Sequence, residues 1–168
     1  TVIDALDEPV RKNAAFDGRA YALALASVRL LDNLGVWARA SDHAQPMLEI
    51  KVSDGHAGQG AAPFFLHFDH AEIEEGPMGH MLEDRFLRRA LLEAMAETLL
   101  ITQVSGDRVI AQEVGPKGAS VTLGCGQTLN ARLIVGSDGR GSGTALRAGI
   151  KRTGWGYGQT ALVAAIAH

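Results

Sequence analysis

The chain has 168 residues, of which 46% are hydrophobic and 21% are charged, so it is long enough and apolar enough to fold around a core. Its 16 lysines and arginines against 19 acidic residues give a net charge of −3, which argues against a protein that binds the phosphate backbone of a nucleic acid. The single cysteine, Cys125, excludes an intramolecular disulfide and a zinc site built from several thiolates.

The printed sequence is not expected to contain a membrane span or a signal peptide. No apolar run approaches the roughly 18 residues that a transmembrane helix requires, and no signal peptide precedes the first predicted strand. The chain begins on Thr1 without a methionine and ends on the apolar run 161–168. We therefore expect it to be a piece of a longer protein.

The spacing of apolar residues predicts the secondary structure. A helical spacing favours one helix over 21–37, with Gly35 as its terminator, and a second over 82–98. Alternating or continuously apolar stretches predict strands at 1–5, 47–53, 64–68, 99–104, 108–114, 119–123 and 131–136. Glycine-containing turns join 99–104, 108–114 and 119–123 into a predicted three-stranded meander.

This order of elements predicts the fold class. Two helices among many strands indicate a mixed α/β fold (α+β in character), without the strict alternation of a doubly wound sheet. The segment 47–78 separates the two helices, and we expect it to belong to another layer or domain.

Two acidic positions follow predicted strands. Asp4 ends the first strand, where a dinucleotide-binding fold places the carboxylate that accepts from the adenosine ribose. Asp138 and Gly139 follow the strand 131–136 in a glycine-rich turn, whose backbone N–H groups can approach an anion closely. Many strands end on Asp and many turns contain Gly, so ordinary turn roles stay open for all three residues.

Two arginines are candidates for binding an anion. Arg19 is expected at the start of the helix 21–37, and Arg85 early in the helix 82–98, where free N–H groups and the helix dipole favour negative charge. A guanidinium fork at such a position suits a pyrophosphate. The alternative is an exposed charge pair in a surface turn. Arg88 and Arg89 are interpreted as solvated side chains.

Other reactive residues are interpreted as structural. His67, Asp69 and His70 come closest to a metal cluster, but neighbours in a strand point to opposite faces, so no metal site is predicted. The serines lack a partner His–Asp arrangement and a Gly-x-Ser-x-Gly turn, which argues against a serine hydrolase. Cys125 lies in a predicted turn and is interpreted as an incidental free thiol.

Five short segments, taken together, resemble one family. They are 16–23 (FDGRAYAL), 34–37 (LGVW), 52–58 (VSDGHAG), 135–140 (VGSDGR) and 155–159 (WGYGQ), which occur in the family's order and spacing. They resemble the flavin-dependent aromatic hydroxylases of ubiquinone biosynthesis, which are group A flavoprotein monooxygenases of the 2-polyprenyl-6-methoxyphenol hydroxylase type. The resemblance covers essentially the whole chain and implies a central fragment of such an enzyme.

The resemblance implies roles for five residues. Asp4 matches the family's acidic residue that holds the adenosine ribose of FAD. Arg19 matches an arginine near the flavin, and Arg85 matches a residue that contacts the ribityl-phosphate region of FAD. Asp138 and Gly139 match the Asp-Gly fingerprint that serves FAD and NAD(P)H together.

The resemblance also implies a domain division and a reaction. Residues 1–46 and 79–149 would be parts of a FAD-binding domain, and 47–78 and 150–168 parts of a substrate domain. The reaction would be hydroxylation of the ring of a polyprenyl-methoxyphenol, with FAD as cofactor, NAD(P)H as reductant and O2 as oxidant. The implied location is the cytoplasm, with peripheral contact at the inner membrane and association with other ubiquinone-biosynthesis enzymes left open.

Two parts of the family pattern lie outside this chain. They are the Gly-x-Gly-x-x-Gly phosphate loop, expected before Thr1, and a Gly-Asp segment, expected after His168. We therefore expect this chain alone to bind FAD poorly and to be inactive. The alternatives are a non-catalytic truncated relative that acts as a binding or scaffold module, and a hydroxylase of a different phenolic substrate.

Overall fold

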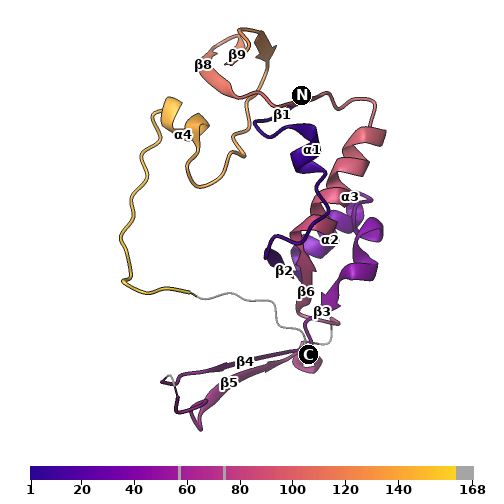
Figure 1. Ribbon diagram of the computed structural model, residues 1–168, viewed down its shortest axis with the longest axis vertical. Helices are drawn as coiled ribbons and strands as arrows, with labels where there is room; N and C mark the ends of the chain where they lie inside the picture. Colours follow the sequence, from indigo (N-terminus) through magenta and orange to yellow (C-terminus); the bar gives the residue numbers. More distant parts are fainter. Residues whose placement is uncertain (57, 74, 162–168) are drawn as a thin grey trace. The chain divides into compact units, whose positions relative to one another are not determined.

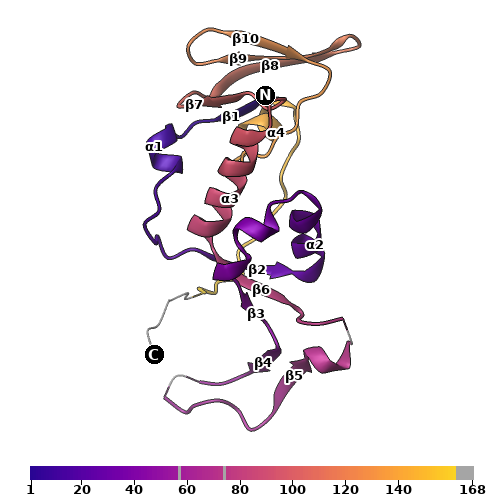
Figure 2. The same cartoon turned by 90° about the vertical axis from the view of Figure 1, so that its right-hand side faces the viewer.

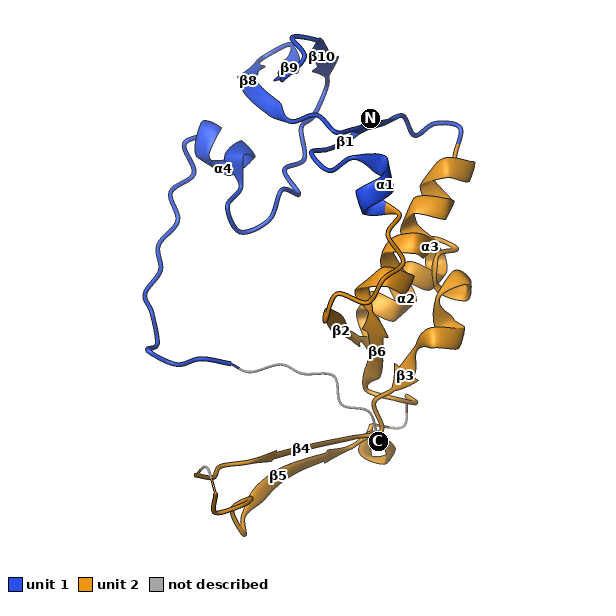
Figure 3. Cartoon of the chain, viewed as in Figure 1, with its two compact units in different colours: residues 1–11, 99–168 blue, residues 12–98 orange. Residues whose placement is uncertain are grey.

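The computed structural model describes residues 1–56, 58–73 and 75–161 (Figure 1). They fall into two compact units, one formed by 1–11 with 99–168 and the other by 12–98 (Figure 3). The chain combines helices with small sheets, as the predicted mixed α/β class requires. The division into a FAD-binding and a substrate domain stays a prediction.

The unit 12–98 contains a three-stranded antiparallel sheet in the order β2 (Ala20–Ala24), β6 (Gly79–Glu83), β3 (Gln45–Pro46). Helix α2 (Leu25–Asn33) follows β2 directly, and helix α3 (Asp84–Glu97) follows β6 directly. Two short 3-10 helices, η1 (Trp37–Arg39) and η2 (Ser41–His43), come after α2. Each long helix therefore begins where a strand of the same sheet ends.

The core of this unit lies between the sheet and its helices. Leu82, on β6, is only 1% exposed and packs with Val36, Ala40 and Ala90. Partly buried apolar side chains surround this group: Leu23, Leu31, Trp37, Ala44, Phe86, Leu87 and Ala94. Because β6 supplies Leu82 and leads directly into α3 at Asp84, the core fixes the start of that helix.

A two-stranded antiparallel hairpin, β4 (Glu49–Ser53) with β5 (Phe65–Asp69), extends from the same unit (Figure 2). A 3-10 turn, η3 (His70–Glu72), follows it. Both strands lie where the apolar alternation predicts them. Apolar residues share one face of the hairpin, because Ile50 pairs with Phe68 and Val52 pairs with Leu66.

The other unit begins with a parallel pair, β1 (Val2–Asp4) beside β7 (Gln103–Ser105). Helix α1 (Glu8–Arg11) follows β1. A three-stranded antiparallel meander comes next, β8 (Val109–Gly115), β9 (Gly118–Leu123) and β10 (Thr128–Ala131), with β9 in the centre (Figure 2). The last helix is α4 (Gly143–Arg147).

The first predicted helix begins later than expected. Residues 20–24 form β2, because their backbone groups pair with β6 in the register Ala20 to Glu83 through Ala24 to Gly79. The helical spacing of apolar residues starts only at Leu25, where α2 begins. Gly35 has a φ of 67°, which glycine adopts readily, and it follows the end of the helix as predicted.

The predicted meander has the wrong first strand. Leu99 and Leu100 are 100% and 94% exposed, and only residues 103–105 form a strand, which pairs with β1 rather than with β8. The third strand of the meander is β10 instead. Its sequence, Thr-Leu-Asn-Ala, has little apolar pattern, so the sequence does not reveal the strand. Backbone pairing with β9 holds it in place.

The predicted strand 131–136 does not form as expected. Ala131 ends β10, and residues 133–139 form neither helix nor strand. Leu133 and Val135 are exposed. An apolar run becomes a buried strand only where neighbouring strands satisfy its backbone, and the described residues place none beside this one.

Candidate functional site

Arg19 and Asp84 lie opposite each other at the end of the β2–β6 ladder. Arg19 directly precedes β2, and Asp84 directly follows β6 and opens α3. The Asp84 backbone N–H donates to the Arg19 carbonyl oxygen at 3.0 Å, which continues the ladder by one bond. The predicted position of Arg19 at the start of the first helix is therefore wrong, and the nearby helix start is that of α3.

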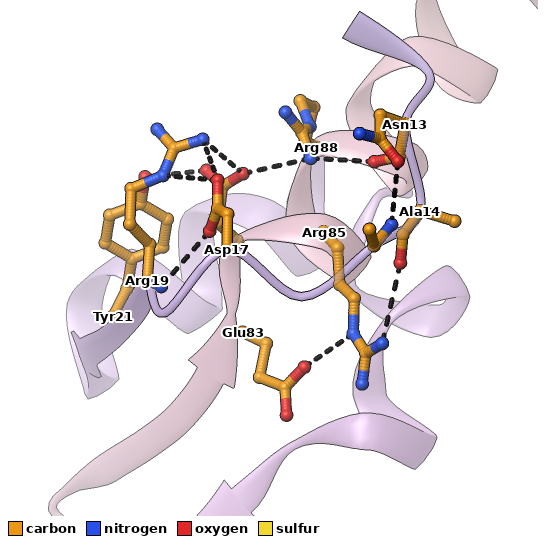
Figure 4. A network of polar contacts seen from close by, with 10 residues as sticks. Asn13, Ala14, Asp17, Arg19, Tyr21, Glu83, Arg85 and Arg88 are labelled. Atoms are coloured by element: carbon orange, nitrogen blue, oxygen red, sulfur yellow. Dashed lines mark hydrogen bonds and ion pairs between the residues drawn. The ribbon is translucent and has the colours of Figure 1, made fainter. Parts of the chain in front are cut away.

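The Asp84 carboxylate is the centre of a polar network, and Figure 4 labels its partners Arg19, Tyr21 and Arg88. Asp84 is 7% exposed. Its Oδ1 accepts from the Tyr21 hydroxyl at 2.7 Å, and its Oδ2 accepts from Nη2 of Arg19 at 3.1 Å and forms an ion pair with Nη2 of Arg88 at 3.3 Å. These partners compensate the cost of burying the charge, and the position in the first turn of α3 adds a favourable interaction with the helix dipole.

Arg19 is anchored along one edge of its guanidinium group. Nε and Nη2 donate to Oδ2 of Asp17 at 2.8 and 2.5 Å, and Nη2 also reaches Asp84. These contacts raise the pKa of Arg19, through the hydrogen bond to Asp17 first and the charge of Asp84 second, and the bond to Arg19 lowers the pKa of Asp17. Nη1 makes no hydrogen bond within the described part of the chain, and the side chain is 55% exposed.

Arg85 is held by one carboxylate, one carbonyl and two aromatic rings. Its Nε donates to Oε2 of Glu83 at 2.6 Å, and Nη1 donates to the carbonyl of Ala14 at 3.5 Å (Figure 4). Its guanidinium carbon lies 4.7 Å from the ring centre of Phe86 and 5.7 Å from that of Phe16. Charge pairing and cation–π contact together restrict its orientation at the start of α3.

Arg88 belongs to the same network, so the interpretation of its side chain as solvated is wrong. Its Nη2 donates to the carbonyl of Asn13 at 2.9 Å and pairs with Asp84, four residues earlier on α3. The i,i+4 spacing of an acid and an arginine is the sequence signal that points to this pair. Three guanidinium groups and three carboxylates thus lie together, and their formal charges cancel. An anion would therefore be bound here by hydrogen bonds from arginine N–H groups rather than by a net positive charge.

Asp4 lies at the carboxyl end of β1, in the other unit. Its Oδ1 accepts from the backbone N–H of Leu6 at 2.9 Å, and its Oδ2 lies 3.8 Å from Nη1 of Arg11. Arg11 is 6% exposed and also donates to the hydroxyl of Ser105 and to Oε1 of Gln103. The buried arginine therefore ties the ends of both parallel strands together beside the carboxylate that the resemblance assigns to a ribose.

Asp138 and Gly139 lie in the loop before α4, as predicted. The Asp138 carboxylate accepts from the hydroxyl of Ser142, and from the backbone N–H and hydroxyl of Thr144 at 2.9 and 3.0 Å. These hydrogen bonds, from Ser142 above all, hold the pKa of Asp138 well below its usual range. Gly139 has a φ of 79°, so the turn depends on glycine. In this structure Asp138 orders the loop around the start of α4.

The side chains around His67 lie differently from the prediction that they point to opposite faces of the strand. His67 and Asp69 are two residues apart in β5 and share a face, and Glu49 pairs across the hairpin with Asp69. One donor atom from each of these three lies within 4.8 Å of the others, although the Lys51 ammonium already contacts Glu49 at 2.8 Å. The absence of a metal site stays a prediction.

Cys125 lies in the turn between β9 and β10, as predicted, and is exposed. Asp107 accepts from the backbone N–H groups of Gly124 and Cys125 at 2.8 and 3.2 Å. Hydrogen bonds from the Cys125 side chain and from the Arg108 backbone are the main causes that lower the pKa of Asp107. These contacts account for the turn without a reactive role for the thiol.

Comparison with known proteins decides the family. Residues 1–166 match the family described as FAD binding domain. The chain belongs to this family. This family agrees with FAD as the predicted cofactor. The resemblance to the hydroxylases of ubiquinone biosynthesis is confirmed by curated relatives.

The curated relatives of this chain include proteins named for ubiquinone biosynthesis. Ubiquinone hydroxylase UbiL of Rhodospirillum rubrum is 43% identical over 167 residues, which are 99% of this chain and 38% of the relative. The 3-demethoxyubiquinol 3-hydroxylase of Escherichia coli is 28% identical, over 99% of this chain and 41% of the relative. The mitochondrial ubiquinone biosynthesis monooxygenase COQ6 of Rattus norvegicus is 29% identical, over 90% and 32%. The chain thus spans 32–41% of the length of these relatives.

Solved structures support the fold. A PqsL variant from P. aeruginosa matches 91% of this chain and 40% of its own, with a TM-score of 0.70 and 22% identity. The flavin-dependent monooxygenase PieE, solved with FAD and substrate, matches 88% of this chain and 27% of its own, with a TM-score of 0.66 and 21% identity. Separately, no helix in the described ranges is long and apolar enough to cross a membrane.

The donor groups in each unit fit the chemistry of FAD. In the unit 12–98, Arg19 and Arg85 offer cationic N–H groups of the kind that phosphate oxygens accept. In the other unit, Asp4 offers a carboxylate, 38% exposed, at the carboxyl end of a parallel strand, where a ribose hydroxyl can donate to it.

Proposed function

We propose that this chain is a segment of a FAD-dependent aromatic-ring monooxygenase that hydroxylates a polyprenyl-methoxyphenol in ubiquinone biosynthesis. The observation that carries the proposal is the 43% identity to ubiquinone hydroxylase UbiL across 99% of the chain. Membership of the FAD binding domain family supports the choice of cofactor. The complete protein, rather than this segment alone, would carry out the reaction.

In this proposal the chain's own residues bind and orient the cofactor. Arg19 donates from its Nη1 edge to a phosphate of FAD, and Arg85 contacts the ribityl-phosphate region from the first turn of α3. Asp4 accepts from the adenosine ribose. Asp138 and Gly139 shape the loop that serves FAD and NAD(P)H. With FAD bound, NAD(P)H supplies electrons and O2 supplies the oxygen atom that enters the ring.

Residues 1–46 and 79–149 would then belong to the FAD-binding domain, and 47–78 and 150–168 to the substrate domain. The apolar face of the β4–β5 hairpin, formed by Ile50, Val52, Leu66 and Phe68, supports a role in covering an apolar substrate. A prenyl tail partitions into lipid, so the proposal includes a cytoplasmic enzyme in peripheral contact with the inner membrane and with other enzymes of the pathway.

The test is product analysis with the complete protein, FAD, NAD(P)H, isotopically labelled O2 and a short-chain polyprenyl-methoxyphenol. The proposal predicts a product that gains one labelled oxygen on the ring. Labelled product from an unprenylated phenol, but none from the prenylated compound, would favour the alternative of a different phenolic substrate.

A scaffold module would bind no flavin and form no product with any phenol. Purified complete protein that lacks FAD, and takes none up when FAD is supplied, would favour that alternative. This chain by itself is expected to take up FAD poorly, and stoichiometric uptake would contradict that expectation.

A further inference from the structure

The anchoring of Arg19 determines which of its N–H groups face outward. A guanidinium group has five donors in one plane, and Asp17 and Asp84 occupy the Nε–Nη2 edge. The Nη1 edge is the one that makes no hydrogen bond within residues 12–56, 58–73 and 75–98. The orientation of Arg19 is therefore set by where the two carboxylates stand.

The two oxygens of the Asp84 carboxylate have different partners, which together hold the carboxylate in place. Oδ1 receives the Tyr21 hydroxyl, and Oδ2 receives Arg19 and Arg88. Tyr21 and Arg19 are two residues apart on an extended backbone, so both side chains lie on the face that meets Asp84 (Figure 4). The hydroxyl of Tyr21 keeps Oδ1 occupied, and this leaves Oδ2 turned toward the arginines.

We propose that Tyr21 and Asp84 are positioning residues for Arg19, which fix the guanidinium plane so that its Nη1 edge faces a phosphate of FAD. This inference rests on the proposed function, in which Arg19 holds the cofactor. Tyr21 acts only through Asp84 and Arg19 and does not itself contact FAD.

Removal of the Tyr21 hydroxyl leaves a nearly buried carboxylate oxygen without its donor. The carboxylate then gains by rotating toward the remaining N–H groups, because an unsatisfied buried acceptor is costly. The Arg19 plane turns with it, and the outward edge loses its fixed direction. Arg19 keeps its charge, so the loss is one of orientation.

The experiment is a titration of FAD into the complete apoprotein, followed by flavin fluorescence. The variants are Tyr21→Phe, Arg19→Ala and the double variant. The matched control is Tyr157→Phe, which removes the hydroxyl of the other tyrosine, 81% exposed. Circular dichroism of each apoprotein confirms that it is folded, and Asp84→Asn serves as a second probe of the same network.

We expect Arg19→Ala, which removes a charged donor, to weaken FAD binding by about tenfold or more. Tyr21→Phe should weaken it by about threefold to tenfold, because it disturbs only the orientation of Arg19. In the Arg19→Ala background, Tyr21→Phe should have almost no further effect, because its influence passes through Arg19. Tyr157→Phe should leave the dissociation constant unchanged.

The outcomes distinguish the proposed cofactor role of Arg19 from the positioning role of Tyr21 and Asp84. Unchanged FAD binding by Arg19→Ala would overturn the proposed role of Arg19 and this inference with it. If Arg19→Ala weakens binding but Tyr21→Phe has no effect, or the same effect in both backgrounds, the positioning role is wrong and the cofactor role of Arg19 stands.

Discussion

Asp84 meets Arg19 twice, since its backbone N–H donates to the Arg19 carbonyl at 3.0 Å and its Oδ2 accepts from Arg19 Nη2 at 3.1 Å. The first bond continues the β2–β6 ladder, and the second sets the side chain. Asp84, the first residue of α3, is thereby joined through its backbone and its side chain to Arg19, the residue before β2. The two contacts fix the position of the Arg19 guanidinium group beside the start of α3.

The hydrogen bond to Asp84 should be visible in the titration of Tyr21. That bond, followed by burial and the charge of Asp84, raises the pKa of Tyr21 above its usual value. Asp84→Asn removes the charge and should lower the Tyr21 pKa toward about 10, the value of a free tyrosine. Ultraviolet absorbance of the tyrosinate, with Tyr157→Phe as background so that one tyrosine of this segment titrates, measures the shift. An unchanged pKa would contradict the network.

The core of the unit 12–98 should depend strongly on Leu82. This side chain is 1% exposed, and Leu82→Ala should lower the free energy of unfolding by about 2–5 kcal/mol because it leaves a cavity. Leu99→Ala, at a fully exposed position, should change it by less than about 0.5 kcal/mol. Chemical denaturation followed by circular dichroism compares the two, and equal losses would show that the packing around Leu82 is misassigned.

Gly139 and Gly141 offer a matched pair in the loop before α4. An added Cβ meets no atom within 4 Å at either position, but only Gly139 has a positive φ, 79°. Gly139→Ala should therefore destabilise the protein by about 1–2 kcal/mol through backbone strain alone. Gly141→Ala should have a much smaller effect. Melting temperatures of the two variants decide the point, and a larger loss at Gly141 would refute it.

The carboxylate of Asp138 should contribute stability that depends on pH. Its pKa is lowered in the folded state, so the contribution is complete above the unfolded pKa, about 3.9, and is lost as pH falls from there toward the folded pKa. Asp138→Asn should therefore melt at a lower temperature than the native protein from pH 7 to about pH 5. The difference should shrink below about pH 4. A difference independent of pH would argue against an ionised Asp138.

Local patterns predicted much of the fold. The second helix, the β4–β5 hairpin and the strands β8 and β9 lie close to their predicted ranges, because each shows its period within a few residues. The segments 20–24, 103–105 and 128–131 were misjudged. Their structure depends on pairing with another strand, and a short stretch of sequence does not reveal its partner.

The candidate site was predictable residue by residue but not as a network. Arg19, Arg85, Asp4, Asp138 and Gly139 could be selected from motifs and strand ends, and their cofactor roles stay proposals. Tyr21 and Asp84 are 63 residues apart in sequence, and only the β2–β6 register brings them together. Residue spacing alone gives no signal for such a contact, whereas the Asp84–Arg88 pair at i,i+4 could have been found.

The most direct test of the central claim is the stoichiometry of FAD in the complete protein, measured by flavin absorbance after release from a known amount of protein. The account predicts about one FAD per chain for the native protein and markedly less for Arg19→Ala purified in the same way. A native protein that neither carries FAD nor takes it up would contradict the claim that this chain is part of a flavin-dependent hydroxylase.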